Sequence, residues 1–209
     1  MTIGDYLRLA TAQLAQAGIE SARLDVLILL EDALDRDKAS ILANPDMDIP
    51  TETLTTLNTQ IVQRMAHLPL AYIRGSWAFY GRNYKVTEDV LVPRPETEDM
   101  ITLLKNLPLP SKPVLADVGT GSGCLAITAA LELPGSRIDA SDISPSAIAV
   151  AEHNNTLHRT HVQFMVRDLL RDVSTPYDVV LANLPYVPNN YAINKAAGLE
   201  PSIALFAGP

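Results

Sequence analysis

Apolar residues recur at helical spacing through the first third of the chain. Three such stripes can be followed, separated by Gly18 and by the Asn44-Pro45-Asp46 break. Because these stripes must be buried against one another or against a neighbouring domain, residues 1–70 are expected to form a small helical domain. The apolar positions are Tyr6, Leu7, Leu9, Ala10 and Leu14 in the first stripe, Leu24, Leu27, Ile28 and Ala33 in the second, and Leu54, Leu57, Ile61, Val62 and Met65 in the third.

The pattern changes to short aromatic and β-branched runs between residues 71 and 96. Residues 72–77 and 84–87 flank Gly81-Arg82-Asn83, which predicts a β-hairpin linking two domains. The Pro93-Arg94-Pro95-Glu96 run that follows is expected to lie outside any helix interior, because each proline disfavours helical geometry in the residue before it.

Strands and helices alternate from residue 97 onward. After a short helix that begins at Thr97, short apolar runs alternate with helical patterns across brief loops, which is typical of a parallel, doubly wound α/β sheet. Residues 97–209 are therefore expected to form a Rossmann-like domain. Its predicted strands are 114–118, 137–142, 162–166 and 177–182, and its predicted helices are 124–131 and 145–154.

The alternation stops after the fourth predicted strand. Residues 192–209 contain no further strand–helix unit, so the last strand would lie at an exposed edge of the sheet. We therefore expect the sequence to lack a C-terminal part of its domain.

Composition narrows the function classes. Of the 209 residues 47% are hydrophobic, as in a globular protein, and the longest apolar run, residues 26–30, is too short to span a bilayer. The N-terminus does not resemble a secretory signal, and a single cysteine, Cys124, excludes an internal disulfide framework. These features predict a cytoplasmic protein that is not membrane-bound.

The charge balance bears on partners. The sequence has 16 Lys and Arg against 24 Asp and Glu, a formal net charge of −8, whereas proteins that wrap nucleic acid usually present a basic face. We therefore expect no direct nucleic-acid substrate. His153, His158 and His161 lack carboxylate or cysteine partners at metal-ligand spacing, so no metal site is expected.

A glycine-rich loop follows the first predicted strand of this domain. It comprises Gly119, Thr120, Gly121, Ser122 and Gly123 after Asp117-Val118 and opens a predicted helix. Glycines permit a tight turn and let a ligand approach the main chain closely. The loop favours a nucleotide-like ligand, although a tight turn without a ligand is the alternative.

Asp142 lies roughly 20 residues after this loop, at the end of the second predicted strand, which is the spacing typical of acids that bind ribose hydroxyls. The alternative is that Asp142 or Ser144 caps the helix that begins at Pro145. The upstream glycine loop favours the ligand interpretation.

Asn183-Leu184-Pro185-Tyr186 directly follows the last predicted strand. The side-chain oxygen of Asn183 and the main-chain carbonyl of Leu184 could accept hydrogen bonds from an amide or exocyclic NH₂ group. Two such acceptors would aim a weakly nucleophilic nitrogen at an electrophilic methyl group. Tyr186 offers a flat face for stacking. The pattern therefore predicts methyl transfer to a planar nitrogen.

Three segments together resemble the HemK/PrmC glutamine methyltransferases. They are Leu91-Val92-Pro93-Arg94-Pro95-Glu96-Thr97-Glu98, the Asp117–Gly123 loop and Asn183-Leu184-Pro185-Tyr186, and Glu200-Pro201 matches the usual continuation. The family usually has proline where this chain has Leu184. Since the role of that position is a main-chain carbonyl, we expect the change to be tolerated.

The resemblance implies a fold, a cofactor and a substrate. It implies a helical domain that helps recognise a peptide chain release factor, followed by a class I methyltransferase domain. It also implies that Gly119–Gly123, Asp142, Leu169 and Asn183 bind S-adenosylmethionine, and that residues 183–186 bind the glutamine of a Gly-Gly-Gln tripeptide as catalytic residues. The methyl group would pass to the N5 amide nitrogen, and the enzyme would act as a monomer.

Several alternatives stay open. Arg94 and Glu96 are expected either to contact the substrate or to hold the linker against the catalytic loop. The same Asn-x-Pro-Tyr chemistry serves adenine-N6 methyltransferases of DNA or RNA, which would need a basic groove for a flipped-out base. A non-catalytic fragment that only binds the release factor is a second alternative.

Overall fold

The computed structural model describes residues 1–174, 176–189 and 191–207, and divides into two compact units at Arg74 and Gly75. In the described residues, no helix has both the length and the apolar character that crossing a membrane requires. We describe the two units separately.

The first unit is helical and has its own core. Leu14, Leu30 and Leu57 are fully buried between its three longest helices. A buried ion pair joins two of these helices: the Arg64 guanidinium lies 2.7 Å from the Asp25 carboxylate, so neither charge is left unpaired. The helices are α1 (Ile3–Gln16), α2 (Ala22–Leu34), α3 (Lys38–Ala43), α4 (Thr51–Met65) and α5 (Leu70–Arg74).

Two features of this unit differ from the sequence prediction. Helix α3 was not anticipated, although Asp37 caps it by accepting a hydrogen bond from the Ser40 N–H at 2.7 Å. Leu24, Val62 and Met65 are exposed, so the predicted apolar stripes are wider than the faces that the unit buries. Single exposed apolar side chains of this kind are common on protein surfaces.

The predicted hairpin begins later than expected. Residues 72–74 belong to helix α5, because the N–H groups of Tyr72 and Ile73 both donate to the Pro69 carbonyl, and the prediction of a strand there was wrong. The observed hairpin pairs β1 (Ser76–Phe79) with β2 (Arg82–Lys85). Tyr80 and Gly81 both have positive φ at its two-residue turn, which is the geometry that matches the twist of an antiparallel pair.

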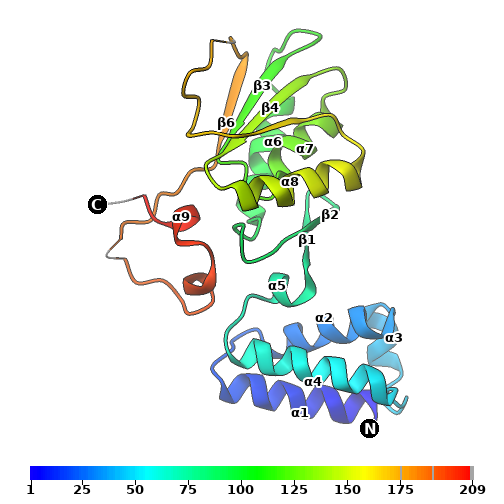
Figure 1. Ribbon diagram of the computed structural model, residues 1–209. Coiled ribbons are helices and arrows are strands. Elements are labelled where there is room, and N and C mark those ends of the chain that lie inside the picture. The colour runs from blue at the N-terminus through cyan, green and yellow to red at the C-terminus, as the bar shows by residue number, and fades with distance from the viewer. Residues whose placement is uncertain (175, 190, 208–209) are drawn as a thin grey trace. The chain divides into compact units, whose positions relative to one another are not determined.

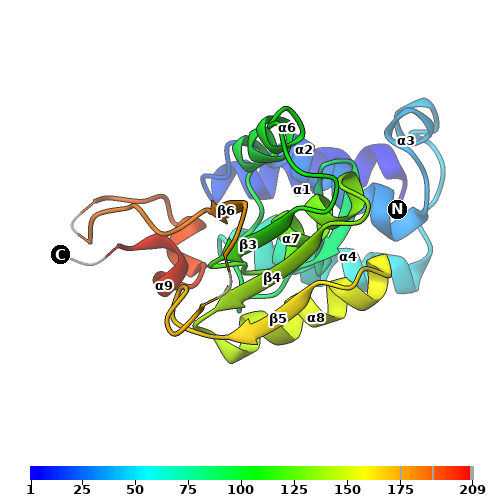
Figure 2. The same ribbon diagram turned by 90° about the horizontal axis from the view of Figure 1, so that it is seen from above.

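The second unit contains the predicted parallel sheet. Its strands are β3 (Val114–Val118), β4 (Arg137–Asp142), β5 (Gln163–Val166) and β6 (Val179–Ala182), in the spatial order β5-β4-β3-β6. Figure 2 shows the four strands side by side in this order. The chain therefore proceeds outward from β3 to one side and returns to the other side for β6, which confirms the Rossmann-like arrangement.

Three helices accompany the sheet: α6 (Glu98–Lys105), α7 (Cys124–Glu132) and α8 (Pro145–His158). Helix α7 contacts β3 and β4, and it also packs against α6 and α8 (Figure 1). The core between these elements is apolar, with Leu115, Ile127 and Ile101 fully buried. This packing fixes the carboxyl ends of the strands, where the candidate site lies.

A segment with little regular structure follows β6. It contains the 3₁₀ turn η2 (Ala197–Leu199) and the short helix α9 (Ser202–Leu205), and it folds back on itself through a parallel bridge between Val187 and Phe206. Another 3₁₀ turn, η1 (Pro95–Thr97), leads into α6, which agrees with the prediction that the proline run lies outside a helix interior.

Candidate functional site

The predicted site residues follow three neighbouring strands. Val118, the last residue of β3, pairs with Ser141 of β4 on one side and with Ala182 of β6 on the other. Gly119, Asp142 and Asn183 are the residues that come next on these three strands. The carboxyl edge of the sheet thus brings the glycine loop, the acid and the predicted catalytic loop, residues 183–186, together at the point where the strand order reverses.

The glycine loop is held by main-chain hydrogen bonds. The N–H groups of Gly119 and Thr120 both donate to the Ser141 carbonyl, at 2.9 and 3.0 Å. The Thr120 hydroxyl donates to the Asp117 carboxylate at 2.6 Å. The loop is therefore anchored to both β3 and β4 before any ligand is considered.

Its three glycines all have positive φ, but their surroundings differ. A Cβ at Gly119 would meet the Leu184 side chain at 3.0 Å, which shows that the glycine loop and the predicted catalytic loop lie against each other. A Cβ at Gly123 would meet Ala151 at 3.0 Å and Phe164 at 3.1 Å. Nothing lies within 4 Å of the same position at Gly121, so open space borders the loop there.

Asp117 is a buried acid beneath this loop. Its burial raises the pKa of the carboxyl group to about 6, a shift that the Thr120 hydroxyl bond partly opposes and that the negative charge of Asp142 increases. The acid lies in β3 and lines the hollow above the loop. The Thr120 hydroxyl and the Ala126 N–H both donate to this carboxylate and favour its ionised form.

Asp142 binds the glycine loop and the start of the next helix. One carboxylate oxygen accepts from the Gly121 N–H at 2.9 Å and the other from the Ser144 N–H at 3.0 Å. Ser144, not Asp142, is the N-cap of α8, because its hydroxyl accepts from the Ala147 N–H. Each carboxylate oxygen has a second lone pair, so Asp142 keeps acceptor capacity for a ligand.

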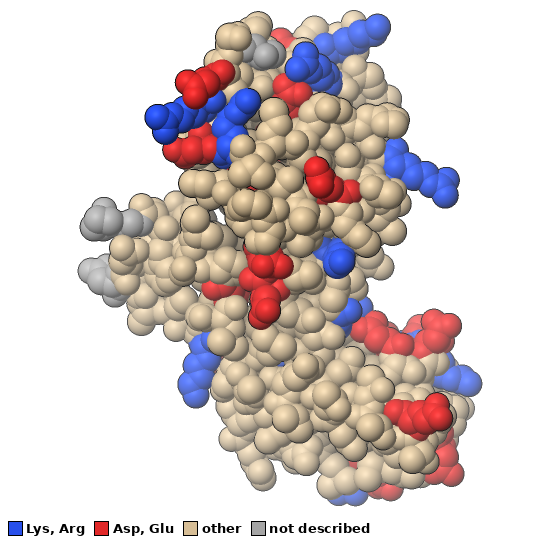
Figure 3. All heavy atoms as spheres, viewed as in Figure 1, with Lys and Arg blue, Asp and Glu red and all other residues tan. Residues whose placement is uncertain are grey.

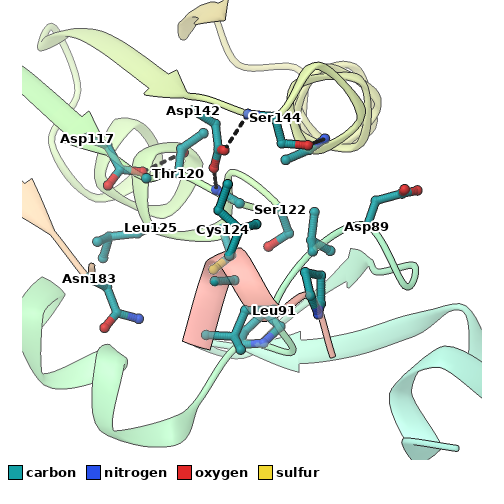
Figure 4. Close-up of a pocket in the computed structure, with 18 of the residues that line it drawn as sticks. Asp89, Leu91, Asp117, Thr120, Ser122, Cys124, Leu125, Asp142, Ser144 and Asn183 are labelled. Carbon is teal, nitrogen blue, oxygen red and sulfur yellow. Dashed lines mark hydrogen bonds between the residues drawn. The ribbon is translucent and has the colours of Figure 1, made fainter. Parts of the chain in front are cut away.

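These residues surround a hollow at the carboxyl edge of the sheet. In Figure 4, Asp142 lies above it, Leu91 below it and Asn183 at one side. The loop from Asp89 to Pro93 and the segment from Pro201 to Ala204 complete its wall. The hollow therefore combines polar groups at the strand ends with apolar side chains opposite them, as small-molecule sites commonly do.

Asn183 lies between this hollow and a second one. The second hollow is lined by the whole of the predicted catalytic loop, Asn183 to Tyr186, and by Arg94, Glu96 and Tyr191. The Asn183 side chain donates from Nδ2 to the Thr97 hydroxyl at 3.3 Å. Within the part of the chain that the structure describes, neither Asn183 Oδ1 nor the Leu184 carbonyl accepts a hydrogen bond. Both predicted acceptors are free.

Two side chains of the predicted catalytic loop, Leu184 and Tyr186, are exposed to solvent. The Tyr186 residue is 80% exposed, and Leu184 is exposed apart from its contact with the glycine loop. Pro185 is partly buried. The flat ring of Tyr186 is thus accessible for stacking, and no aromatic ring among the described residues stacks on it.

Arg94 and Glu96 have different surroundings. Arg94 donates to the Glu200 carboxylate at 2.6 Å, and the Val92 N–H donates to the other oxygen of Glu200 at 3.0 Å. This contact ties the proline run to the segment after the catalytic loop. Glu96 is exposed at the second hollow and has no ion-pair partner among the described residues.

Leu169 is not brought together with the other predicted cofactor residues. It does not line the first hollow, and its side chain is half exposed. Its φ of 51° lies in the left-handed region, and its carbonyl accepts a hydrogen bond from the Ser141 hydroxyl at 3.0 Å. Its role beside an adenine stays a prediction.

Sequence reasoning missed two polar residues that hold the site. Thr97 binds the Asn183 side chain and lines both hollows. Asn154 in α8 is fully buried and donates to the carbonyls of Ser122 and Lys85, at 2.8 and 3.0 Å, so it ties the hairpin to the glycine loop. Periodicity could not reveal either role, because both depend on contacts distant in sequence. An asparagine on the buried face of a helix was the available signal.

In the described ranges, no three His, Cys, Asp or Glu side chains gather where a metal ion could be held. Cys124 is buried at the start of α7, and burial raises its thiol pKa to about 12. A thiol with this pKa stays protonated at neutral pH and is a poor nucleophile.

Known proteins match both units of the chain. The PrmC N-terminal domain family matches residues 5–75, and the methyltransferase small domain family matches residues 100–198. A release factor glutamine methyltransferase of Coxiella burnetii is 37% identical, over 90% of this chain and 69% of its own length. Proteins of the same name from Koribacter versatilis and Deinococcus radiodurans are 35% and 33% identical, over 100% of this chain and 76% of their own lengths. This chain belongs to the release factor glutamine methyltransferase family.

Proposed function

We propose that this protein transfers the methyl group of S-adenosylmethionine to the side-chain N5 nitrogen of the glutamine in the Gly-Gly-Gln tripeptide of a peptide chain release factor. Family membership supports the reaction and the protein substrate. The arrangement of the two hollows on either side of Asn183 supports the roles of the residues.

The first hollow fits the cofactor. Open space borders Gly121, where a bound group could approach the main chain, and Asp142 keeps acceptor capacity for ribose hydroxyls. Asp117 and Asp142 supply negative charge near a ligand that carries a positive sulfonium and an ammonium group. S-adenosylmethionine supplies a methyl group made electrophilic by its sulfonium. We assign residues 119–123, Asp142 and Asn183 to its binding, and Leu169 to the adenine edge.

The second hollow accepts the glutamine side chain. The Asn183 Oδ1 and the Leu184 carbonyl would each accept one N–H of the amide, which orients its nitrogen toward the first hollow. Both acceptors would stabilise the positive charge that develops on the nitrogen as it takes the methyl group, while the sulfonium would leave as a neutral thioether. The nitrogen then loses a proton to water. Tyr186 and Pro185 would pack against the amide plane, with Arg94 and Glu96 beside the neighbouring glycines.

One observation carries this proposal. Asn183 and Thr97 line both hollows, together with Leu91 and Ala204, so a group held by Asn183 borders the cofactor space directly. Direct transfer requires the nitrogen and the methyl carbon to approach to about 3–3.5 Å, which adjacent hollows permit.

We do not favour a nucleic-acid substrate. Basic side chains on the face seen in Figure 3 are interspersed with acidic ones, and the sequence carries a net charge of −8. A duplex with a flipped-out adenine would favour a continuous basic surface beside the site. We further propose that residues 1–70 help recognise the release factor and that the protein acts as a monomer in the cytoplasm, where translation terminates.

The experiment is a labelling assay with methyl-labelled S-adenosylmethionine. The protein is incubated with a release factor, with the same factor in which the tripeptide glutamine is replaced by alanine, and with adenine-containing RNA and DNA. The expected result is label in the first sample alone. Label in nucleic acid would support the adenine alternative. Release-factor binding with no label would support a non-catalytic role, and titration calorimetry with S-adenosylmethionine would then show whether the cofactor binds.

A further inference from the structure

Thr97 occupies the boundary between the two hollows. It follows the proline run at the end of η1, where its N–H donates to the Arg94 carbonyl at 3.0 Å. Only 9% of the residue is exposed. Its hydroxyl oxygen accepts the hydrogen bond from Asn183 Nδ2 at 3.3 Å, and this contact joins residues far apart in the sequence.

The two ends of an asparagine amide have nearly the same shape and opposite hydrogen-bonding character. The oxygen accepts, and the nitrogen donates. A substrate NH₂ group can bind Asn183 only if Oδ1 faces it. If the amide turned over, Nδ2 would meet the substrate nitrogen with hydrogen against hydrogen.

We propose that Thr97 is a positioning residue that fixes the orientation of the Asn183 amide. Its hydroxyl accepts from Nδ2 on one side of the amide, so the side chain is held in place with Oδ1 as the group presented to the reacting nitrogen. This inference rests on the proposed function, because it assigns Thr97 a part in orienting the same amide.

The test compares Thr97→Val, which removes the hydroxyl at nearly constant shape, with Thr97→Ser, which keeps it. Thr102→Val is the matched control, because Thr102 is an exposed threonine on α6 that lines neither hollow. For each variant, the methyl-transfer rate constant is measured at saturating cofactor with the release factor, and the cofactor Kd is measured by calorimetry.

We expect Thr97→Val to lower the transfer rate constant about 10-fold, as the loss of one hydrogen bond predicts, with the cofactor Kd within 2-fold of wild type. Thr97→Ser and Thr102→Val should retain wild-type rates. Wild-type transfer by Thr97→Val would overturn the proposal. Equal losses in the Val and Ser variants, or a cofactor Kd that rises with the rate loss, would overturn it in favour of a packing role.

A second readout does not need activity. In protein labelled with ¹⁵N-asparagine, the Asn183 side-chain NH₂ signals are assigned by their loss in Asn183→Ala. The signal of the Nδ2 proton that is hydrogen-bonded to the Thr97 hydroxyl should shift in Thr97→Val, and this proton should exchange faster with solvent. Neither change should occur in Thr97→Ser or Thr102→Val. If wild-type protein fails to methylate the release factor, the proposed function fails, but this measurement still tests the hydrogen bond between Thr97 and Asn183. Unchanged signals in Thr97→Val would overturn the proposed role of Thr97.

Discussion

The two sides of Asn183 are built in different ways. On the glycine-loop side, Thr120 and Ser122 are buried, and the loop binds β4 and Asp117 through hydrogen bonds within the chain. On the other side, Tyr186 is 80% exposed and Tyr191 is 66% exposed. One side has its geometry fixed by the fold, and the other presents aromatic surface to solvent.

This difference matches the two ligands that we propose. A small cofactor binds best in a hollow whose donors and acceptors are already in place, because little order must then be imposed on binding. Exposed aromatic side chains gathered around one hollow are typical of surfaces that bind a protein segment. The comparison leads to a general expectation: changes on the glycine-loop side should alter cofactor affinity or stability, and changes on the open side should alter transfer alone.

Asn183→Ala should have the largest effect. Loss of the Oδ1 acceptor should lower the transfer rate constant by about 10²–10³-fold, as for the removal of one oriented hydrogen-bonding group from other active sites. The free energy of unfolding should change little, because Asn183 makes one hydrogen bond in the described structure. Single-turnover transfer and urea unfolding measure the two effects. Asn106→Ala, at the end of α6, is the control, and a wild-type rate for Asn183→Ala would sink the proposed role.

Gly121→Ala and Gly123→Ala should distinguish two roles of the glycine loop, which are cofactor binding at Gly121 and packing at Gly123. Both positions have positive φ, which costs alanine about 1–2 kcal/mol. Because a Cβ at Gly123 also meets Ala151 and Phe164, that variant should lose about 2–4 kcal/mol of unfolding free energy in total. Gly121→Ala should lose only the free energy that positive φ costs alanine, because its methyl group meets no other atom of the protein. The methyl group would enter the open space that we assign to the cofactor, so cofactor binding should weaken about 10-fold.

Urea unfolding and calorimetric titration with S-adenosylmethionine separate these outcomes. Equal stability losses in the two glycine variants would show that backbone strain alone matters. Unchanged cofactor affinity in Gly121→Ala would show that the cofactor does not approach the loop at that point.

Asp117 predicts a pH dependence on the same side. Its pKa is raised to about 6 in the fold, so the folded protein holds an extra proton between pH 4 and 6 and loses stability as the pH rises through that window. A shift of this size corresponds to about 3 kcal/mol at most. Asp117→Asn keeps a group that accepts from the Thr120 hydroxyl and cannot ionise. The variant should therefore gain unfolding free energy relative to wild type as the pH rises from 4 to 7.

Urea unfolding of both proteins at several pH values checks this difference. Other titrating groups are common to the two proteins and cancel in the comparison. A constant difference between the curves from pH 4 to 7 would mean that the Asp117 pKa is not raised.

The two sides also differ in how far the sequence predicts them. The glycine loop, Asp142 and Asn183 follow directly from strands with clear apolar patterns, and parallel strands bring their carboxyl ends to one edge. Such features are local and periodic. The Thr97–Asn183 and Glu200–Arg94 contacts join positions far apart in the chain, and no periodic pattern encodes them.

The errors in the fold have similar causes. Residues 72–74 are aromatic or β-branched in part and resemble a strand, but two hydrogen bonds to Pro69 close a helical turn, and Gly75 with a φ of 70° ends it. Local hydrogen bonding decided the conformation there over residue preference. Helix α3 is too short to show a full apolar stripe, and only its Asp37 cap marks it in the sequence.

Glu200→Gln should have the smallest effect and tests whether the two sides are independent. Glu200 is buried and binds both Val92 and Arg94, and the segment after it lines both hollows. Glutamine can still accept from the Val92 N–H but loses the charge that pairs with Arg94. Since the Arg94 side chain is 40% exposed and can regain water, we expect a loss of about 1–2 kcal/mol in unfolding free energy.

The informative comparison for Glu200→Gln is between the change in cofactor Kd and the change in KM for the release factor. The glycine loop keeps its bonds to Ser141 and Asp117 in this variant, so the cofactor Kd should rise less than 3-fold while the KM for the release factor rises more. Glu20→Gln, at an exposed position of the first unit, controls for the change in net charge. If the cofactor Kd rose as much as the KM for the release factor, the two sides of Asn183 would not be independent. The wall formed by residues 201–204 would then contribute to cofactor binding as much as the glycine loop does.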